Sequence, residues 1–495
     1  MENAGVFLLL VTRAAPVLLS LLLLYVGYNL LLHPLSRYPG PFAAKLTNAY
    51  GTYFAIQKRL HLTTHQNFQK YGKHDETPDH MSLHPRATKG DSYRALRTDF
   101  KSTNILTTID REQHSLKRKM ILKVASDRST REFESIMSSQ VDRFHEQLLK
   151  SCNAGNYVNM TEQCSRLALD VVAHMAFGFP LETLAKGENR FVLECLDFIT
   201  WLGNACMQLP ALSPLAVLFL RIGHGNYLRA EQMIKTMIQT RQAGGNASLH
   251  DLYSAFSSSR SVAPAMASSF FYLSRNRSCY EALANEIRST FTSASEIVSG
   301  PRLAGCKYLR ACIDETLRIT NPTTTLPWRV EELGEKDEDK PFIIDGHVIP
   351  RGTEVAVNLY SLFHNEEYFD DSFSYKPERW LEPEEGQTES EEQKRARQTM
   401  RKAFAPFWLG DRSCAGKTVA YLEMTLVLAR TIFFFDFETA PGKAGLLGGG
   451  EAGRTDGRGR PDEFQLHDAL TALTDGPNLI FHKRGDFWKS LRSAD

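Results

Sequence analysis

The residues with the clearest chemical meaning lie in one loop near the carboxyl end of the chain. Phe407, Gly410, Arg412, Cys414 and Gly416 form the pattern F-x-x-G-x-R-x-C-x-G, directly before an apolar helical segment. A cysteine at the start of a helix faces the positive end of the helix dipole, which favours the thiolate, and a thiolate can bind a metal ion. Gly410 permits a tight turn, Gly416 permits close approach of a flat ligand, and Arg412 can meet an anion. We therefore expect Cys414 to be a metal ligand.

The alternative interpretation of Cys414 is a buried cysteine in an ordinary loop, which is the default for the seven other cysteines. These cysteines show no paired short spacing, so the sequence favours neither a disulfide framework nor a zinc knuckle. Lys and Arg (58) nearly balance Asp and Glu (57), so no broad basic surface for nucleic acid is expected.

The elements that must hold this loop are mainly helical. Residues 417–437 predict a helix that begins just after the cysteine. Two further segments carry apolar residues at steps of three and four, which predicts helices with one face in the core. The first stripe is Phe133, Ile136, Met137, Val141, Phe144 and Leu148, and the second is Cys164, Leu167, Ala168, Val171, Val172 and Met175.

Strands are expected in only one region. Residues 342–350 alternate about an Asp345-Gly346 turn, which predicts a short hairpin that residues 354–357 continue. Residues 382–397 are charged and residues 441–461 are rich in glycine, so both are expected to be surface loops. The sequence predicts one large, mainly α domain with small β-sheets.

The amino end differs in composition from the rest of the chain. Residues 14–32 carry no charge and would reach about 28 Å as a helix, close to the thickness of a bilayer core. We expect a single-pass anchor at residues 1–32, a proline-rich hinge at 33–45 and a catalytic domain at 46–495. A cleaved signal peptide is the competing interpretation. Arg37 and Lys45 follow the span and Arg13 precedes it, which weakly favours a cytosolic body.

The cysteine pattern resembles the haem loop of the cytochrome P-450 family, in which the cysteine is the axial ligand of the haem iron. Two further motifs of that family occur in the same order. Glu315 and Arg318 match its E-x-x-R pair, and Arg379 matches its P-E-R-W element. The resemblance implies the cytochrome P-450 fold after one transmembrane helix, with these three residues as a buried structural triad. It covers nearly the whole chain and is closest in style to membrane-bound fungal members of secondary metabolism.

Haem carries two propionates, which need cations in an apolar pocket. His114 and Arg118 stand four apart and are similar to the W/H-x-x-x-R of the family's early helix. Arg329 stands where the family's strand arginine reaches a propionate, and Arg412 lies two residues before the ligand. The resemblance implies that these residues, with Phe407, Gly410 and Gly416, contact the cofactor.

The chain departs from the family pattern in two places. Residues 73–78 are polar where relatives have a strand pair, so the sheet near the entrance is expected to be incomplete. The family's A-G-x-[D/E]-T, which delivers protons during dioxygen activation, corresponds here to residues 257–261. Ser261 is then the candidate for proton delivery, Arg260 replaces an acid, and Pro264 is expected to break or kink the helix. A different register, or a segment missing from the gene prediction, is the alternative.

By this resemblance the chain is a haem-thiolate monooxygenase that inserts one oxygen atom of O2 into an apolar small molecule. Electrons would come from NADPH through a membrane-bound reductase, with a b-type cytochrome as a second donor, at the endoplasmic reticulum. Two alternatives stay open. One is a related isomerase, dehydratase or peroxide-using enzyme, and the other is a haem-deficient tethered protein without activity. The sequence does not identify the substrate.

Overall fold

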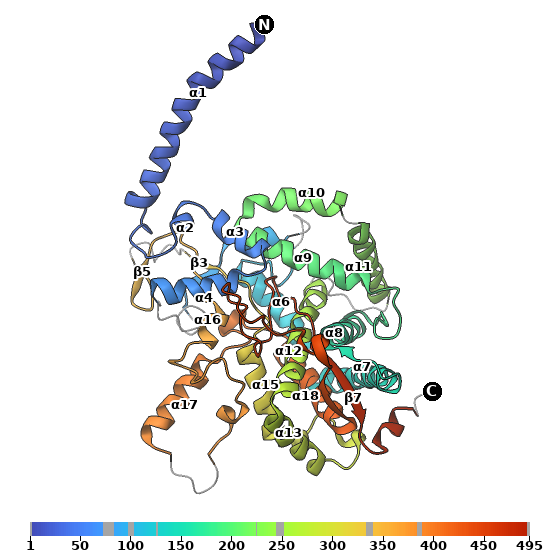
Figure 1. The fold of residues 1–495 in the computed structure, drawn as a ribbon. Helices are drawn as coiled ribbons and strands as arrows, with labels where there is room; N and C mark the ends of the chain where they lie inside the picture. Colours follow the sequence, from blue (N-terminus) through green and yellow to red (C-terminus); the bar gives the residue numbers. More distant parts are fainter. Residues whose placement is uncertain are drawn as a thin grey trace.

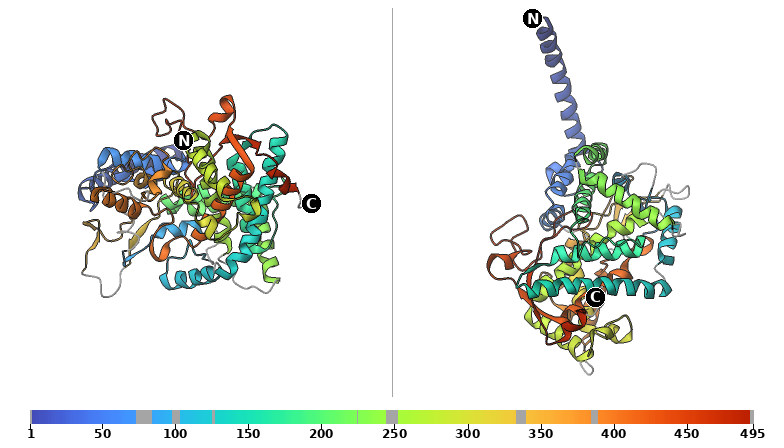
Figure 2. Two further views of the ribbon diagram at one scale, coloured as in Figure 1. Left: turned by 90° about the horizontal axis from the view of Figure 1, so that it is seen from below. Right: turned by 90° about the vertical axis from the view of Figure 1, so that its right-hand side faces the viewer.

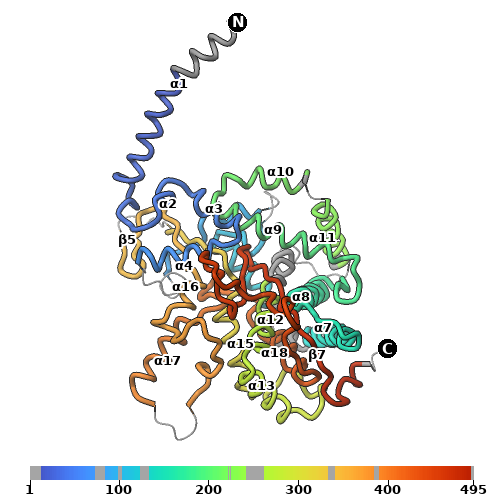
Figure 3. Tube along the Cα trace, in the orientation of Figure 1, coloured from blue at the N-terminus to red at the C-terminus, as the bar shows by residue number. Residues whose placement is uncertain are grey.

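Helices account for most of the fold. The structure is a computed structural model that describes residues 2–72, 84–97, 103–124, 127–223, 225–243, 252–332, 340–383 and 389–492 (Figure 1), and Figure 3 draws the same chain as a tube. In chain order the α-helices are α1 (Glu2–Gly27), α2 (Phe42–Leu46), α3 (Ala49–Ile56), α4 (Leu60–Tyr71), α6 (Arg111–Val124), α7 (Asp127–Asn153), α8 (Met160–Phe177), α9 (Phe191–Gln208), α10 (Ser213–Gly223), α11 (Gly225–Ala243), α12 (Leu252–Arg275), α13 (Arg277–Thr290), α14 (Pro301–Ala304), α15 (Lys307–Ile319), α16 (Leu359–Phe363), α17 (Glu391–Ala403) and α18 (Lys417–Phe434).

The main core surrounds α12, which contacts α8, α13, α15 and α18 (Figure 1). The two apolar stripes predicted from the sequence lie on α7 and α8, and their most buried members, including Phe144 and Leu167, belong to this core. Local signals set the ends of α8. The Asn159 side chain accepts a hydrogen bond from the backbone N–H of Glu162, and Gly178 ends the helix in the left-handed conformation with φ 65°. The prediction of a mainly helical domain is confirmed.

Three small antiparallel sheets complete the fold. The strands are β1 (Ala87–Lys89), β2 (Val158–Asn159), β3 (Arg329–Glu331), β4 (Phe342–Ile344), β5 (His347–Ile349), β6 (Phe435–Thr439) and β7 (Asn478–Lys483). They pair as β1-β3, β2-β7-β6 and β4-β5. The β4-β5 hairpin confirms the predicted turn, because Asp345 and Gly346 both have positive φ. The register of β1 and β3 sets Lys89 opposite Arg329, which matters for the site.

Several boundaries differ from the sequence-based expectations. Residues 391–403 form α17 instead of a loop, because Ser390 and Gln393 make a capping box and charges of opposite sign pair along the helix. Residues 354–357 contribute a single bridge from Val355 to Arg329 and no strand. The helix after the cysteine ends at Phe434, where β6 takes over. Residues 73–78, where a strand pair was expected to be missing, lie outside the described residues.

The amino-terminal helix projects away from the body (Figure 1). Arg13–Leu32 is long and apolar enough to cross a membrane, and none of it is buried against the rest of the protein. The last five residues of this segment form a π-helical turn, Tyr28–Leu32, before the proline-rich stretch. Helix α10 lies on the same side of the body as the exit of α1 (Figures 1 and 2).

Candidate metal centre

The loop that carries Cys414 is closed by backbone hydrogen bonds. The N–H of Cys414 donates to the carbonyl of Phe407 over 2.8 Å, and that of Ser413 donates to Gly410 over 3.2 Å. Gly410 has φ 73°, so the turn uses the left-handed conformation that glycine adopts without strain. The Phe407 ring lies 5.1 Å from that of Tyr421 on α18, which ties the loop to the helix that follows it. The sequence thus builds a fixed support for one thiol.

Cys414 is exposed, whereas six of the other cysteines are buried and Cys152 is half-buried. The backbone N–H groups of Gly416 and Lys417 hydrogen-bond the sulfur, as expected at the start of α18. Burial still raises the pKa of the Cys414 thiol, because protein surrounds the sulfur on its other sides, while these N–H groups and Arg118 oppose the rise. A bound metal ion would deprotonate such a thiol.

Gly416 does not need a special backbone conformation, since its φ is −88°. A Cβ added at Gly416 would lie 3.8 Å from the Cys414 sulfur, with no clash in the protein itself. Its small size therefore keeps the space beside the sulfur open, which suits a flat ligand bound at that atom.

Two arginines connect the loop to α6 and the residues before it. Arg118 on α6 donates to both the carbonyl and, at 3.0 Å, the hydroxyl oxygen of Ser413. Arg412 donates to the carbonyls of Thr108 and Ile109 at 3.2 and 2.8 Å. The structure thus brings Arg118 to the residue before Cys414 and uses Arg412 to tie the loop to residues 108 and 109.

Further cations gather at the same place. Arg329 on β3 donates to the Tyr93 hydroxyl at 3.1 Å, and Lys89 opposite it on β1 donates to the carbonyls of Ile105 and Leu106 at 2.9 and 2.6 Å. Both side chains are buried. The sequence analysis missed Lys89, because a lone lysine in a three-residue strand carries no motif. Only the strand pairing places it here.

The positive charges of this group lower the pKa values of its basic side chains. Burial, and after it Arg412, Lys89, Arg118 and Arg329, lower the pKa of His114 from 6.5 to about 3. Burial, Arg412 and Arg329 lower the pKa of Lys89 well below 10.5, and Asp411 alone is the acid that opposes this. We call Lys89, His114, Arg118, Arg329 and Arg412 the cationic cluster. Its charges exceed those of the nearby carboxylates.

The donor set fits a haem. An accessible thiol at a helix start can ligate iron, and a cluster with too few carboxylates can receive the two propionates. Among the described residues, no group of three or more His, Cys, Asp and Glu side chains could hold a metal ion by itself. A porphyrin would supply the further ligands of an iron bound at Cys414.

Glu315, Arg318 and Arg379 meet in one cluster, which we call the buried ion cluster. Arg318 donates to the two Glu315 oxygens at 2.9 and 2.7 Å, and Arg379 donates to Glu315 at 3.2 Å. Trp380 and the backbone N–H of Lys376 donate to the same carboxylate at 2.9 and 3.0 Å. Glu315 and Arg318 are fully buried. The pKa of Glu315 is lowered although burial, the largest influence, acts to raise it, because Arg318 and the other donors outweigh burial.

The remaining donors of Arg318 fix two nearby segments. Its Nη1 atom donates to the carbonyls of Phe363 and Ser372 at 2.8 and 2.6 Å, and Nη2 donates to Ser374 at 3.2 Å. Every charge in this cluster has a partner. Such a cluster can hold the fold around the cysteine loop, and it has no group left for bond-making chemistry.

Ser261 lies half-buried on α12, away from the cysteine loop in sequence and on a separate element. The sequence predicts that Pro264 breaks or kinks the helix; the break is wrong, because the helix runs without interruption from Leu252 to Arg275, and the kink stays a prediction. Tertiary packing overrides the local cost of proline here, because Ala263 and Ala265 on either side are buried in the core. The side chains of Ser257 and Arg260 lie outside the described residues, and so does any contact they make.

One more buried acid was missed. Glu423 on α18 is 2% exposed, and burial raises its pKa to about 8. Its Oε1 atom has no hydrogen-bond partner in the described part of the chain. The apolar run around Glu423 gave no sign that this side chain points inward.

Known proteins resemble this chain over most of its length. The profile of the family described as Cytochrome P450 matches residues 80–252 and 252–446. The chain is 30% identical to cytochrome P450 monooxygenase AKT7 of Alternaria alternata, over 95% of this chain and 97% of that protein. It is 27% identical to cytochrome P450 monooxygenase poxM of Penicillium oxalicum, over 97% and 96%. The solved haem domain of a cytochrome P450DA mutant is similar in fold, with TM-score 0.66 and 14% identity over 88% of this chain and 95% of that one.

Proposed function

The chain belongs to the cytochrome P450 family, and we propose that it is a membrane-anchored haem-thiolate monooxygenase that inserts one atom of O2 into an apolar small molecule. The observation that carries the proposal is the exposed thiol of Cys414 beside the cationic cluster, whose positive charges outnumber the carboxylates near them. The fungal monooxygenases among its relatives support a place in secondary metabolism.

In this proposal the cysteine loop and the two clusters of charged residues have different roles. Cys414 holds the iron, with the N–H groups of Gly416 and Lys417 stabilising its negative charge. Arg118, Arg412, Arg329 and Lys89 hold the propionates, while Glu315, Arg318 and Arg379 keep the loop in place. A thiolate-bound haem supplies the dioxygen chemistry when it is present.

Proton handling falls to Ser261 in this proposal. Its hydroxyl can hold a water molecule and pass a proton, as the family's threonine does. Arg260 is a permanent cation, so it can orient water but cannot relay a proton. The missing acid supports the second candidate function, a haem-dependent isomerase, dehydratase or peroxide-using enzyme that does not activate O2.

The test uses the full chain, expressed with a fungal NADPH reductase. A reduced carbon-monoxide difference spectrum with a thiolate signature is expected. Its absence would favour the alternative of a haem-deficient tethered protein without activity. Product formed only with NADPH and reductase supports the monooxygenase, while conversion without reductant supports the isomerase or dehydratase. Product formed from added peroxide alone identifies a peroxide-using enzyme.

Ser261→Ala tests the proton path. It is expected to send most reducing equivalents to hydrogen peroxide, because the water it holds is lost. Ser274→Ala is the matched control, since Ser274 lies on the same helix and bonds only within it, to the carbonyl of Phe271 at 2.9 Å, and to Arg275. Equal product per NADPH in the two variants would mean that Ser261 has no part in proton delivery.

For the cell we propose a single-pass protein of the endoplasmic reticulum with its body in the cytosol, which takes electrons from an NADPH reductase and, as a second donor, a b-type cytochrome. Helix α10 lies on the side from which the anchor leaves (Figure 2), and it carries the exposed apolar residues Leu215, Leu218, Phe219 and Ile222.

Deleting residues 1–32 should leave only peripheral attachment, which alkaline extraction removes. Resistance to that extraction would show a second inserted segment. Metabolite profiling of a deletion strain would identify the substrate.

A further inference from the structure

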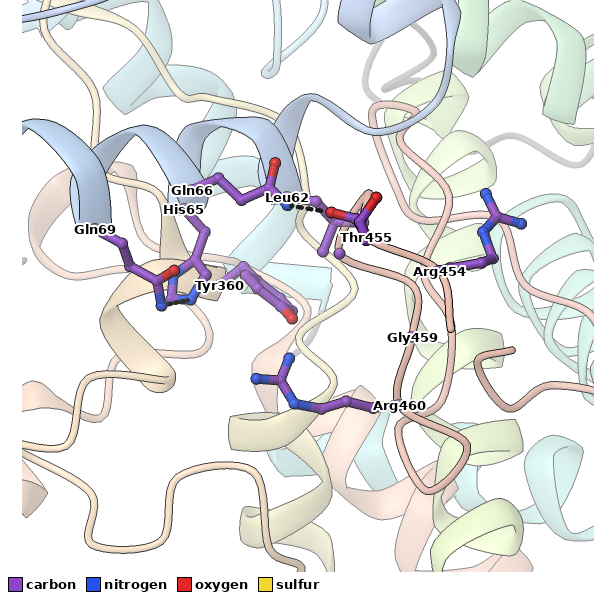
Figure 4. A pocket seen from close by; sticks show the side chains of 10 residues that line it. Leu62, His65, Gln66, Gln69, Tyr360, Arg454, Thr455, Gly459 and Arg460 are labelled. Carbon is purple, nitrogen blue, oxygen red and sulfur yellow. Dashed lines mark hydrogen bonds between the residues drawn. The ribbon is translucent and has the colours of Figure 1, made fainter. Parts of the chain in front are cut away.

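A pocket lies apart from the cysteine loop. It has a volume of about 370 Å³ between α4, α16 and residues 454–460 (Figure 4). Its lining holds two arginines, a histidine and two glutamines but no carboxylate; the lining residues are Leu62, His65, Gln66, Gln69, Tyr360, Arg454, Thr455, Gly457, Gly459 and Arg460. The lining is therefore polar, with a positive charge.

Arg460 is the distinctive residue of this pocket. Its guanidinium lies 3.6 Å from the centre of the Phe373 ring and 3.7 Å from Glu463, which is too far for a hydrogen bond. Within the described part of the chain this guanidinium donates no hydrogen bond to protein, although it is only half exposed. Figure 4 shows it extending toward Tyr360, while Arg454 points away from them. Its donors are thus held in place and available to a ligand.

The described groups around Arg460 leave its N–H donors without a hydrogen bond. Tyr360 donates its hydroxyl to Oε1 of Glu463 over 2.5 Å, while Oε2 of Glu463 forms an ion pair with Arg460 at 3.7 Å that is too long for a hydrogen bond. Arg454 is paired with Asp456 at 2.5 Å. Gln66 reaches the carbonyl of Thr455 only at 3.5 Å, and its amide nitrogen carries a second hydrogen that can serve a ligand.

The wall that carries Arg460 is rigid. The N–H of Gly450 donates to the carbonyl of Arg460 over 2.9 Å. A Cβ at Gly459 would lie 2.4 Å from the carbonyl oxygen of Arg454, and one at Gly457 would lie 3.2 Å from Leu62 on α4. Only glycine allows the loop to fold this tightly against α4, so the position of Arg460 is set before any ligand arrives.

We infer that this pocket binds the oxyanion group of a small ligand, a phosphate or a carboxylate, through the guanidinium of Arg460. The planar fork of an arginine matches two oxygens of such a group. Occupancy also affects the core. Phe373, on which Arg460 stacks, lies between Ser372 and Ser374, whose carbonyls hold Arg318. A bound anion therefore stabilises the segment that supports the buried ion cluster.

The experiment measures thermal unfolding of the full-length haem-loaded protein in nanodiscs of phosphatidylcholine, with inorganic phosphate as the probe and sodium chloride at matched ionic strength as reference. A saturable rise in Tm of roughly 2 °C is expected for the wild type. Arg460→Gln should weaken phosphate binding roughly tenfold or more, because the charged donor is lost. Arg277→Gln, an exposed arginine on α13 paired with Glu281, should leave the response unchanged.

Two further measurements keep the inference open to refutation. If Arg460→Gln folds poorly, Gln66→Leu removes a donor and keeps the arginine, and it should weaken binding by a smaller factor. Nanodiscs that contain phosphatidic acid separate the sources of the group: a free ligand predicts the same phosphate response in them, and a lipid headgroup predicts a raised Tm before phosphate is added. A wild-type Tm that follows ionic strength alone, or an equal response in Arg460→Gln, would overturn the inference.

Discussion

The buried ion cluster and the cationic cluster are both rich in arginine, yet they are built in opposite ways. In the buried ion cluster, Glu315 receives hydrogen bonds from Arg318, Arg379 and Trp380, and the spare donors of Arg318 meet backbone carbonyls. In the cationic cluster, cations face one another, and within the described residues the arginines donate to neutral oxygens.

The pKa shifts express the same difference. Glu315 keeps its charge, since its pKa is lowered in spite of complete burial. His114 and Lys89 are pushed toward their neutral forms, with pKa values well below their usual range. The first cluster is complete in the protein alone, whereas the second becomes favourable only when an anion arrives. A structural ion cluster and a ligand site can thus be distinguished by whether their charges balance.

The largest effect is expected from a substitution in the buried ion cluster. Arg318→Ala leaves Glu315 charged, buried and without its main partner, which should cost about 3–5 kcal/mol of unfolding free energy. Urea unfolding should show this loss with and without haem, together with poor haem retention. Lys394→Ala removes the partner of Glu391 on α17, an ion pair with the same spacing of three residues in which both side chains are exposed, and should cost less than about 1 kcal/mol. Equal losses in the two variants would show that burial does not distinguish the clusters.

Removing the thiol comes next. Cys414→Ala should abolish the thiolate signature in the reduced carbon-monoxide spectrum, while the unfolding free energy of the haem-free protein stays almost unchanged because the side chain is exposed. Cys312→Ala, a buried cysteine on α15, should keep the spectrum and lose some stability. A normal carbonyl spectrum in the Cys414 variant would contradict the assignment of the ligand.

Lys89→Met tests the difference between the two clusters, because it removes one charge from the cationic cluster and keeps a side chain of similar length. The haem-free protein should differ little in stability from the wild type, since relieved repulsion from Arg412 and Arg329 offsets the loss of the hydrogen bonds from Lys89 to the carbonyls of Ile105 and Leu106. Haem should dissociate roughly tenfold faster, because a charged donor to the propionates is lost. Transfer of haem to apomyoglobin measures this rate. A haem-free variant that unfolds more easily would place Lys89 among the structural residues.

The smallest effect concerns pH. The pKa of His114 is about 3 when folded and 6.5 when unfolded, so the unfolded chain binds more protons between these values. The contribution of neutral His114 is complete above about pH 6.5 and is lost as the pH falls toward 3. His114→Gln should therefore flatten the fall of Tm between pH 7 and 5 in the haem-free protein. Haem should flatten it as well, because propionates raise the pKa of His114; an unchanged slope in the variant would exclude His114 as its source.

Local patterns explain why some of this could be predicted from sequence. The stripes on α7 and α8 and the Asp345-Gly346 turn depend on neighbours within a few residues, and both are found as expected. The helix α17 was missed because its stability comes from a cap and charge pairs, which an apolar periodicity does not register. Lys89 was missed because its place depends on pairing with Arg329, 240 residues further along the chain, which no local pattern encodes.

The proline inside α12 has a consequence for the segment around Ser261. Pro264 has no N–H, so the backbone carbonyl of residue 260, one turn earlier, has no donor at its usual helical position. The helix continues through this point, so the carbonyl of residue 260 lacks the one hydrogen bond that a non-proline residue 264 would donate. That oxygen can accept a hydrogen bond from a water molecule or from a polar group of the substrate. If the proposed register of residues 257–261 holds, position 260 lacks the acid of the family's motif, but the backbone carbonyl there is kept whatever side chain stands at that position.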